Sequence, residues 1–231
     1  MVKNFTFVLF SLLTFNSLAQ YKAFVGIKGG GHVSTIYMEH TVYNIRANTE
    51  FLTSYHIGLF GKLFTNQKQS SFLNTGLQLG VDYDSKGWRQ RFNTGAPDYF
   101  TRLDYLEIPI EAIIYAGKGG TKYFLTMGPY LEYLLAVDKD ALPAEAEIGQ
   151  SEVYPIEIDE VNRFGYGGRM SAGLHQDTSI GAFHLEIFFN ISIRGVLNPD
   201  SLSAVRTPDQ SNQYVIGFSI GYLVPFGKMK F

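Results

Sequence analysis

The chain has 231 residues, with 24 Gly, 19 Phe, 15 Tyr, no Cys and a formal net charge of −2. The near-neutral charge gives no indication of a nucleic-acid partner or an acidic tail, and the lack of cysteine excludes disulfides. Charged residues make up 17% of the chain, against roughly 25% in a typical soluble domain, so much of the outer surface need not be charged.

The first 19 residues have the three parts of a secretory signal peptide. Lys3 supplies the positive charge, residues 5–15 form an apolar stretch too short to span a bilayer comfortably, and Ser17-Leu18-Ala19 is a small-x-small cleavage site. A single membrane anchor or a buried N-terminal strand are the alternatives. We expect residues 1–19 to be a removed signal peptide and residues 20–231 to form one exported barrel domain.

Strand-like segments follow, and helical periodicity is nearly absent. After residue 19 no run of about 18 apolar residues occurs, so no transmembrane helix is expected. Each segment is long enough to cross a membrane as a tilted strand, which takes roughly 9–11 residues. The eight predicted strands are 22–35, 54–65, 71–84, 102–116, 121–137, 162–175, 180–194 and 213–226.

Residues of the predicted strands alternate between an apolar face and a polar or glycine-rich face. In the last strand, for example, Ile216, Phe218 and Ile220 alternate with Gly217 and Ser219. A soluble β-sandwich shows the same period of two. The apolar faces, however, run unbroken for five to seven positions, and the glycine-rich faces suit a narrow interior better than a solvated surface.

The connections between these strands alternate in length. Those at 36–53, 85–101, 138–161 and 195–212 are long, and those at 65–70, 116–121 and 176–179 are short. Outer-membrane barrels have long extracellular loops and short periplasmic turns. The sequence therefore predicts an all-β, eight-stranded antiparallel up-and-down transmembrane β-barrel in the cell outer membrane, with both termini in the periplasm. Aromatic residues near predicted strand ends are assigned to interfacial girdles, with an ordinary core as the alternative: Tyr83, Trp88, Tyr105, Tyr115, Tyr123, Tyr133, Tyr222 and Phe226.

Five segments resemble a known family in their order and spacing: GIKGGGHVS, YHIGLFGKL, LDYLEIPIEAIIY, YFLTMGPYLEYLL and GFSIGYLVPF. The chain is similar to the PorT-like outer-membrane β-barrels of Bacteroidota, which carry an outer membrane protein beta-barrel domain, and the YLEIP and GPYL elements are the most specific part of the match. The resemblance implies an outer-membrane location and little about activity. The PorT branch is implicated in a protein secretion and gliding apparatus.

Charged residues occur on the inward faces of the predicted strands. An eight-stranded barrel is just wide enough for side chains to fill it, and an unpaired buried charge is costly. We therefore predict a lumenal salt-bridge network and no continuous water channel. The predicted members are Lys28, Lys62, Glu107, Glu111, Glu132, Arg163, Arg169, Glu186 and Arg194. An ion or proton path, or a carboxylate pair for acid–base catalysis, is the alternative, although Glu107 and Glu111 would lie roughly 13 Å apart.

Two positions leave the register open. Pro109 cannot donate to a strand ladder, so a bulge or a local missing bond is expected there. Many barrels end on an aromatic residue, and here either Phe226 or Phe231 could end the last strand.

The sequence predicts that the protein is not an enzyme and binds no cofactor or metal. It contains no G-x-S-x-G and no H-E-x-x-H, and its histidines are scattered. A barrel enzyme would need a residue such as His40 close to a loop Ser or Asp. We expect a structural or binding module that acts through the long loops, with a secretion component or a narrow porin as alternatives. The expected partners are outer-membrane lipid and other envelope or secretion proteins, and no nucleic acid.

Overall fold

The computed structural model describes residues 21–40, 45–65, 73–91, 98–117, 119–140, 158–198 and 210–226. The predicted signal peptide and Phe231 lie outside these ranges. Eight long strands make up most of the described chain: β1 (Tyr21–His40), β4 (Leu52–Thr65), β5 (Asn74–Gln90), β6 (Tyr99–Ala116), β7 (Thr121–Lys139), β8 (Phe164–Thr178), β9 (Gly181–Ser192) and β10 (Gln210–Phe226). Two short strands, β2 (Ile45–Arg46) and β3 (Thr49–Glu50), and a 3-10 helix, η3 (Ile158–Glu160), complete it. No helix in these ranges has the length and apolarity to cross a membrane.

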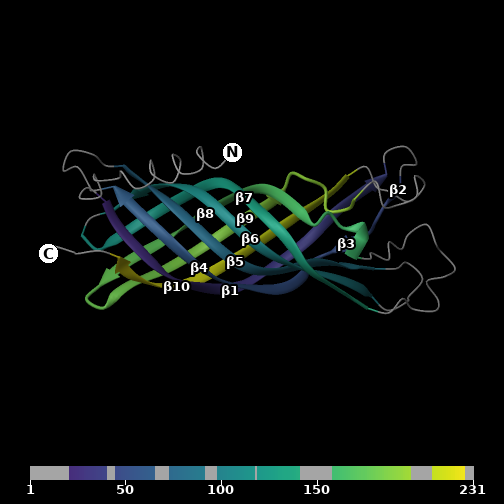
Figure 1. Ribbon diagram of the computed structural model, residues 1–231, viewed down its shortest axis with the longest axis horizontal. Helices are drawn as coiled ribbons and strands as arrows, with labels where there is room; N and C mark the ends of the chain where they lie inside the picture. The colour runs from purple at the N-terminus through teal and green to yellow at the C-terminus, as the bar shows by residue number, and fades with distance from the viewer. Residues whose placement is uncertain are drawn as a thin grey trace, which may run out of the picture.

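The eight long strands form a closed barrel. Each pairs antiparallel with the next long strand along the chain, and β10 pairs antiparallel with β1 to close the sheet. Figure 1 shows the strands winding obliquely around the barrel axis. The short strands extend this sheet, β2 beside β1 and β3 beside β5. The predicted eight-stranded up-and-down barrel is therefore confirmed.

The two ends of the barrel differ in their connections. At one end, here called the short-turn end, lie the links β4–β5, β6–β7 and β8–β9, together with the start of β1 and the end of β10. The β6–β7 turn there contains Gly119 with φ of 64°, a left-handed conformation that favours glycine. The opposite end, the long-loop end, carries the links β1–β4, β5–β6, β7–β8 and β9–β10. Three of them are longer than any link at the short-turn end. The β5–β6 link, predicted to be long, is only as long as the β4–β5 link, because β5 and β6 extend into the predicted loop. Strand β10 is described as far as Phe226, and Phe231, the other predicted end of the last strand, lies outside the described residues.

The strands reach further at the long-loop end than the sequence predicted. Strand β1 continues to His40 instead of residue 35, and β5 continues to Gln90 instead of residue 84. In the added part of β5 the positions that continue the outward face by alternation are Ser85 and Gly87, both buried, in place of apolar residues. The apolar alternation that marked the strand therefore stops before the strand does.

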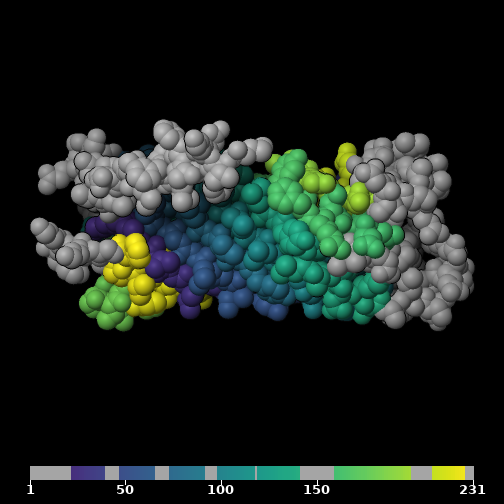
Figure 2. Space-filling model, viewed as in Figure 1, coloured from purple at the N-terminus to yellow at the C-terminus, as the bar shows by residue number. Residues whose placement is uncertain are grey.

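Side chains in the middle of each strand alternate between the lumen and the outside as predicted. In β6, Ile108 and Ile110 are about two-fifths exposed, whereas Glu107 and Glu111 are fully buried. The outward residues form an apolar surface around the barrel, and Figure 2 shows neighbouring strands closing the wall on one side. Large outward residues include Val25, Ile27, Ile57, Leu59, Leu77, Leu79, Val81, Leu106, Ile114, Leu125, Met127, Leu131, Leu185, Ile187, Ile216, Phe218 and Ile220. Such a surface matches the lipid-facing band of a membrane barrel.

Pro109 itself lacks a bridge on its β5 side only, and on the β7 side the bridges are missing at the next two residues, Ile110 and Glu111. Its pairing position on β5 is Gly80, and these two residues form no bridge, although the bridges on both sides keep one register. A Cβ atom on Gly80 would lie 3.2 Å from the Pro109 ring, so glycine leaves room for the ring. On the other side Pro109 pairs with Tyr130. A local gap in the pairing was one of the two predicted outcomes, and the bulge of β6 lies instead between Asp104 and Tyr105.

The predicted aromatic girdles are wrong for three residues. Trp88, Tyr105 and Tyr115 are at most 3% exposed and point into the lumen, whereas Tyr123 and Phe226 are largely exposed on the outside. The three buried residues stand at even spacing from other inward residues of their strands. Proximity to a strand end was therefore a poorer guide than the face of the strand.

Two apolar clusters fill the ends of the lumen. The short-turn cluster consists of Phe24, Phe60, Phe64, Ile113, Tyr115, Phe124, Ala182 and Leu223. The long-loop cluster consists of Ile36, Met38, Ala47, Trp88, Leu103, Tyr105, Leu134, Val161, Val196 and Leu197. The charged interior of the barrel lies between them.

Candidate functional site: the lumenal charge network

Ten buried charged residues fill the middle of the lumen. We call them the lumenal network: Lys28, Lys62, Asp82, Asp84, Lys86, Glu107, Glu111, Glu132, Arg169 and Glu186. Each is 4% exposed or less, and together they come from seven of the eight long strands. Charges this deeply buried are tolerated only when paired and hydrogen-bonded, so their contacts decide what the lumen can do.

Arg169 of β8 is the centre of one half of the network. Its guanidinium lies 3.2 Å from a carboxylate oxygen of Glu107, 3.8 Å from Glu111 and 2.7 Å from Glu186. Gln78 extends this group by donating to Glu111 at 2.8 Å and to Glu186 at 3.2 Å. Four strands, β5, β6, β8 and β9, are thus joined across the lumen through one arginine and one glutamine.

Lys86 of β5 is the centre of the other half. Its Nζ donates to Glu107 at 2.7 Å and to Glu132 at 2.8 Å, and lies 3.5 Å from Asp84. Because Glu107 contacts both Lys86 and Arg169, it connects the two halves. Glu107 is the glutamate of the YLEIP element, so this element supplies the carboxylate shared by both centres.

Glycines in β8 make room for the second half. A Cβ atom on Gly165 would lie 2.4 Å from a carboxylate oxygen of Glu132, and one on Gly167 would lie 2.5 Å from the hydroxyl of Tyr130. The glycine-rich start of β8 therefore allows large inward side chains of β7 to lie against bare backbone.

The two remaining lysines are held differently. Lys28 of β1 lies 2.8 Å from a carboxylate oxygen of Asp82. Lys62 of β4 donates to Nδ1 of His184 at 3.1 Å and lies 3.5 Å from the centre of the Phe124 ring. His184 in turn bonds Glu186 through its other ring nitrogen at 3.1 Å. Lys62 thus reaches a carboxylate through a histidine and is further stabilised by a cation–π contact.

Arg163 and Arg194 do not belong to the network, so this part of the prediction is wrong. Strand β8 begins one residue after Arg163, whose exposed side chain lies 3.9 Å from Asp159. Strand β9 ends two residues before Arg194, whose exposed side chain donates to Asn162 at 3.1 Å. Extending the strands by two residues had placed both arginines on the inward face.

The structure brings the other seven predicted residues into the lumen and adds three that the sequence analysis did not name. Asp82 lay inside the predicted third strand. Asp84 ended that strand, and Lys86 fell in the predicted loop. The alternation of Asp82, Asp84 and Lys86 could have identified all three had the strand been extended.

A second set of polar contacts involves the histidines of β1 and β4. His56 Nε2 and Ser219 Oγ lie 2.8 Å apart, and His32 Nε2 donates to the backbone carbonyl of Ser85 at 2.8 Å. The imidazole rings of His32 and His56 stack with their centres 5.8 Å apart. All of these side chains are buried, so the contacts are internal to the barrel.

Within the described ranges no three His, Asp or Glu side chains are arranged to hold a metal ion. Six carboxylates face four lysine or arginine cations in the lumenal network, with His184 and His32 beside two of the carboxylates. This arrangement pairs buried charges with one another inside the described part of the barrel.

These features define a class of protein: a closed antiparallel barrel with an apolar outer band and a packed, charged interior. The chain belongs to the outer membrane protein beta-barrel domain family, whose profile matches residues 18–198. Its location is accordingly the outer membrane. A search of curated proteins found no match.

Several solved outer-membrane proteins have similar folds at low sequence identity. OprG from Pseudomonas aeruginosa is 9% identical, with a TM-score of 0.45 over 88% of this chain and 96% of that one. Neisserial surface protein A is 12% identical, with a TM-score of 0.41 over 87% and 97%. The outer membrane protease OmpT from Escherichia coli is 7% identical, with a TM-score of 0.44 over 90% and 97%. Similarity at this level says nothing about what this chain binds or does.

Proposed function

We propose that this protein is a non-conducting outer-membrane barrel that serves as a structural or binding module through its long loops. The supporting observation is the lumenal network, buried between the short-turn and long-loop clusters. An eight-stranded barrel is just wide enough for side chains to fill it, so the buried side chains in its middle and at both ends support a lumen closed to ions. Following the usual asymmetry of such barrels, the long-loop end faces the outside of the cell and the short-turn end faces the periplasm. The loops are then the surface available to a ligand or partner.

Conductance across a planar lipid bilayer tests this proposal. The protein is refolded in detergent, its folded state is checked by the shift of the unboiled band in a gel, and a trimeric porin serves as a positive control for insertion. We expect no steady current steps from the folded protein. A stable open channel of reproducible conductance would overturn the proposal in favour of a narrow porin.

A role in a secretion or gliding apparatus is the second candidate, and it rests on the resemblance to PorT-like barrels. The most specific elements of that resemblance lie on the paired strands β6 and β7, where Glu107, Pro109 and Tyr130 point into the lumen. The most specific elements of the resemblance therefore contribute residues to the barrel interior, and a partner protein would have to bind another surface of the barrel. Affinity isolation from native outer membranes tests this role. Stoichiometric recovery of secretion subunits would favour it, and recovery of the barrel alone would count against it.

We also propose that the protein is not an enzyme. His56 and Ser219 form a serine–histidine contact in the described chain, and both are buried in the barrel wall and lumen. The side chain of His40, the rim residue named from the sequence, lies outside the described side chains. A fluorophosphonate probe applied to the folded protein should not label it. Labelling that disappears in Ser219→Ala would contradict this assignment.

A further inference from the structure

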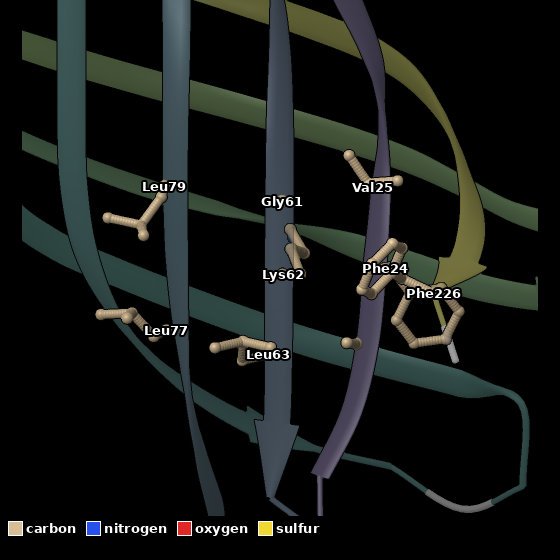
Figure 3. A pocket seen from close by; sticks show the side chains of 9 residues that line it. Phe24, Val25, Gly61, Lys62, Leu63, Leu77, Leu79 and Phe226 are labelled. Atoms are coloured by element: carbon tan, nitrogen blue, oxygen red, sulfur yellow. The ribbon is translucent and has the colours of Figure 1, made fainter. Parts of the chain in front are cut away.

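The outer wall of the barrel has a recess near the short-turn end. It has a volume of about 280 Å³ and is lined by residues of β1, β4, β5 and β10. Figure 3 shows Gly61 on the central strand, with Leu77 and Leu79 on one side and Val25 and Phe226 on the other. A second recess, of about 550 Å³, follows along β1 around Gly29 and Ile57. Both hollows thus lie on the lipid-facing surface, outside the lumen.

The glycine at the floor of the first recess is not required by packing. A Cβ atom on Gly61 would have no neighbour closer than 3.4 Å. At Gly128 of β7, by contrast, a Cβ atom would lie 1.9 Å from the backbone oxygen of Ile110. The chain therefore has room for a side chain at Gly61, and its absence leaves a hollow between large apolar neighbours.

The walls of the recess are apolar. Its side chains are those of Ala23, Val25, Leu63, Leu77, Leu79 and Phe226, with Phe24 beside them. Lys62 contributes only backbone, because its side chain is buried in the lumen against His184. A peptide or sugar in this recess would leave its polar groups unsatisfied. A hydrocarbon chain would not.

The recess also overlies the seam at which the barrel closes. Ala23 of β1 pairs with Phe226 of β10 and with Leu63 of β4, so the first and last long strands meet at its edge. The second recess spans the same three strands, between Ile27, Leu59 and Ile220. Both hollows are continuous with the apolar band that contacts lipid in an outer-membrane barrel. The candidate occupant is therefore a component of the bilayer itself.

We propose that this recess is a binding site for one acyl chain of a membrane phospholipid, held along the β10–β1–β4 seam more tightly than the surrounding lipid. Gly61 and Ala23 provide the space, and Leu79, Leu63 and Phe226 provide the walls. At the short-turn end the phospholipid belongs to the periplasmic leaflet. The site goes beyond the proposed loop function, because it concerns the membrane-facing wall.

Native mass spectrometry of the folded protein tests the site. The barrel is stripped of lipid in mild detergent and titrated with phosphatidylethanolamine. Gly61→Leu fills the recess, and Gly168→Leu is the matched control, since an added Cβ on that glycine of β8 would have no neighbour closer than 3.8 Å. We expect wild type and Gly168→Leu to retain one phospholipid, and Gly61→Leu to bind it about tenfold more weakly, as for roughly two lost buried methylenes.

Four results would overturn the proposal. These are equal retention by wild type and Gly61→Leu, no retained lipid in wild type, retention of lipid A in preference to phospholipid, or a wild-type dimer that Gly61→Leu dissociates. The last result would assign the recess to a second copy of the chain. Gly61→Ala guards against a folding defect, because its smaller side chain fits the space and should leave most of the binding intact.

Discussion

Replacing Arg169 by methionine is the most direct test of the lumenal network. Arg169 contacts Glu107, Glu111 and Glu186 within 3.8 Å and is 3% exposed. Methionine keeps much of the side-chain volume and removes the charge, which leaves these carboxylates with fewer cations in a dry interior. Breaking a buried ion pair from one side costs about 3–5 kcal/mol. We therefore expect Arg169→Met to lower the free energy of unfolding by at least about 3 kcal/mol.

The free energy is measured by urea unfolding of the protein refolded in lipid vesicles, followed by circular dichroism and by the gel shift of the folded band. Arg163→Met is the control, because this exposed arginine lies outside the network and should change stability by no more than about 0.5 kcal/mol. The double variant Arg169→Met with Glu186→Gln should recover part of the loss. A loss of about 1 kcal/mol or less for Arg169→Met, the value of a surface pair, would refute the description of a tightly paired lumen.

Three further predictions follow from named contacts. Gly128→Ala should prevent folding or reduce its yield strongly in a refolding assay, because its Cβ would lie 1.9 Å from the Ile110 backbone oxygen; normal yield would contradict this packing. Trp88 is 1% exposed in the long-loop cluster, so its fluorescence should be blue-shifted and should be quenched neither by acrylamide nor by brominated lipid. Strong quenching by brominated lipid would mean that Trp88 faces the membrane, as a girdle residue would. Asp177→Asn removes the carboxylate that lies 2.7 Å from Lys122 at the partly exposed short-turn end of the lumen. Urea unfolding should show a free energy of unfolding lower by about 1 kcal/mol or less. A larger loss would mean that water is excluded from this end of the lumen.

The period of two in the sequence was sufficient to predict the barrel and the facing of its residues. A strand between lipid and a packed lumen must alternate lipid-facing apolar residues with lumen-facing residues, because its two faces contact different surroundings. Glu107 and Glu111 could therefore be assigned to the lumen from β6 alone. The prediction was weakest where the outward face is no longer apolar, as at Ser85 and Gly87 of β5, and there the strand was ended too early.

The pairing of the charges could not be predicted in the same way. Alternation gives the face of a residue and not its height along the barrel, and height depends on the stagger between strands. Lys28 meets Asp82 and Lys86 meets Glu107 only because of the register between β1, β4, β5 and β6. Strand ends are equally hard to place. Strand β9 ends two residues before Arg194, and this is enough to leave the Arg194 side chain exposed instead of inside the lumen.

The lumenal network has a consequence for how the barrel is assembled. Its contacts join residues far apart in the chain, such as Gln78 with Glu186 and Lys62 with His184, so they form only when the sheet has curled round. A slip of one residue as β1 joins β10 would turn Lys28 from the lumen toward lipid, where a lysine costs roughly 2–4 kcal/mol near the bilayer midplane. The buried charges therefore penalise an incorrectly joined barrel, and they make the native register the one in which the sheet can close.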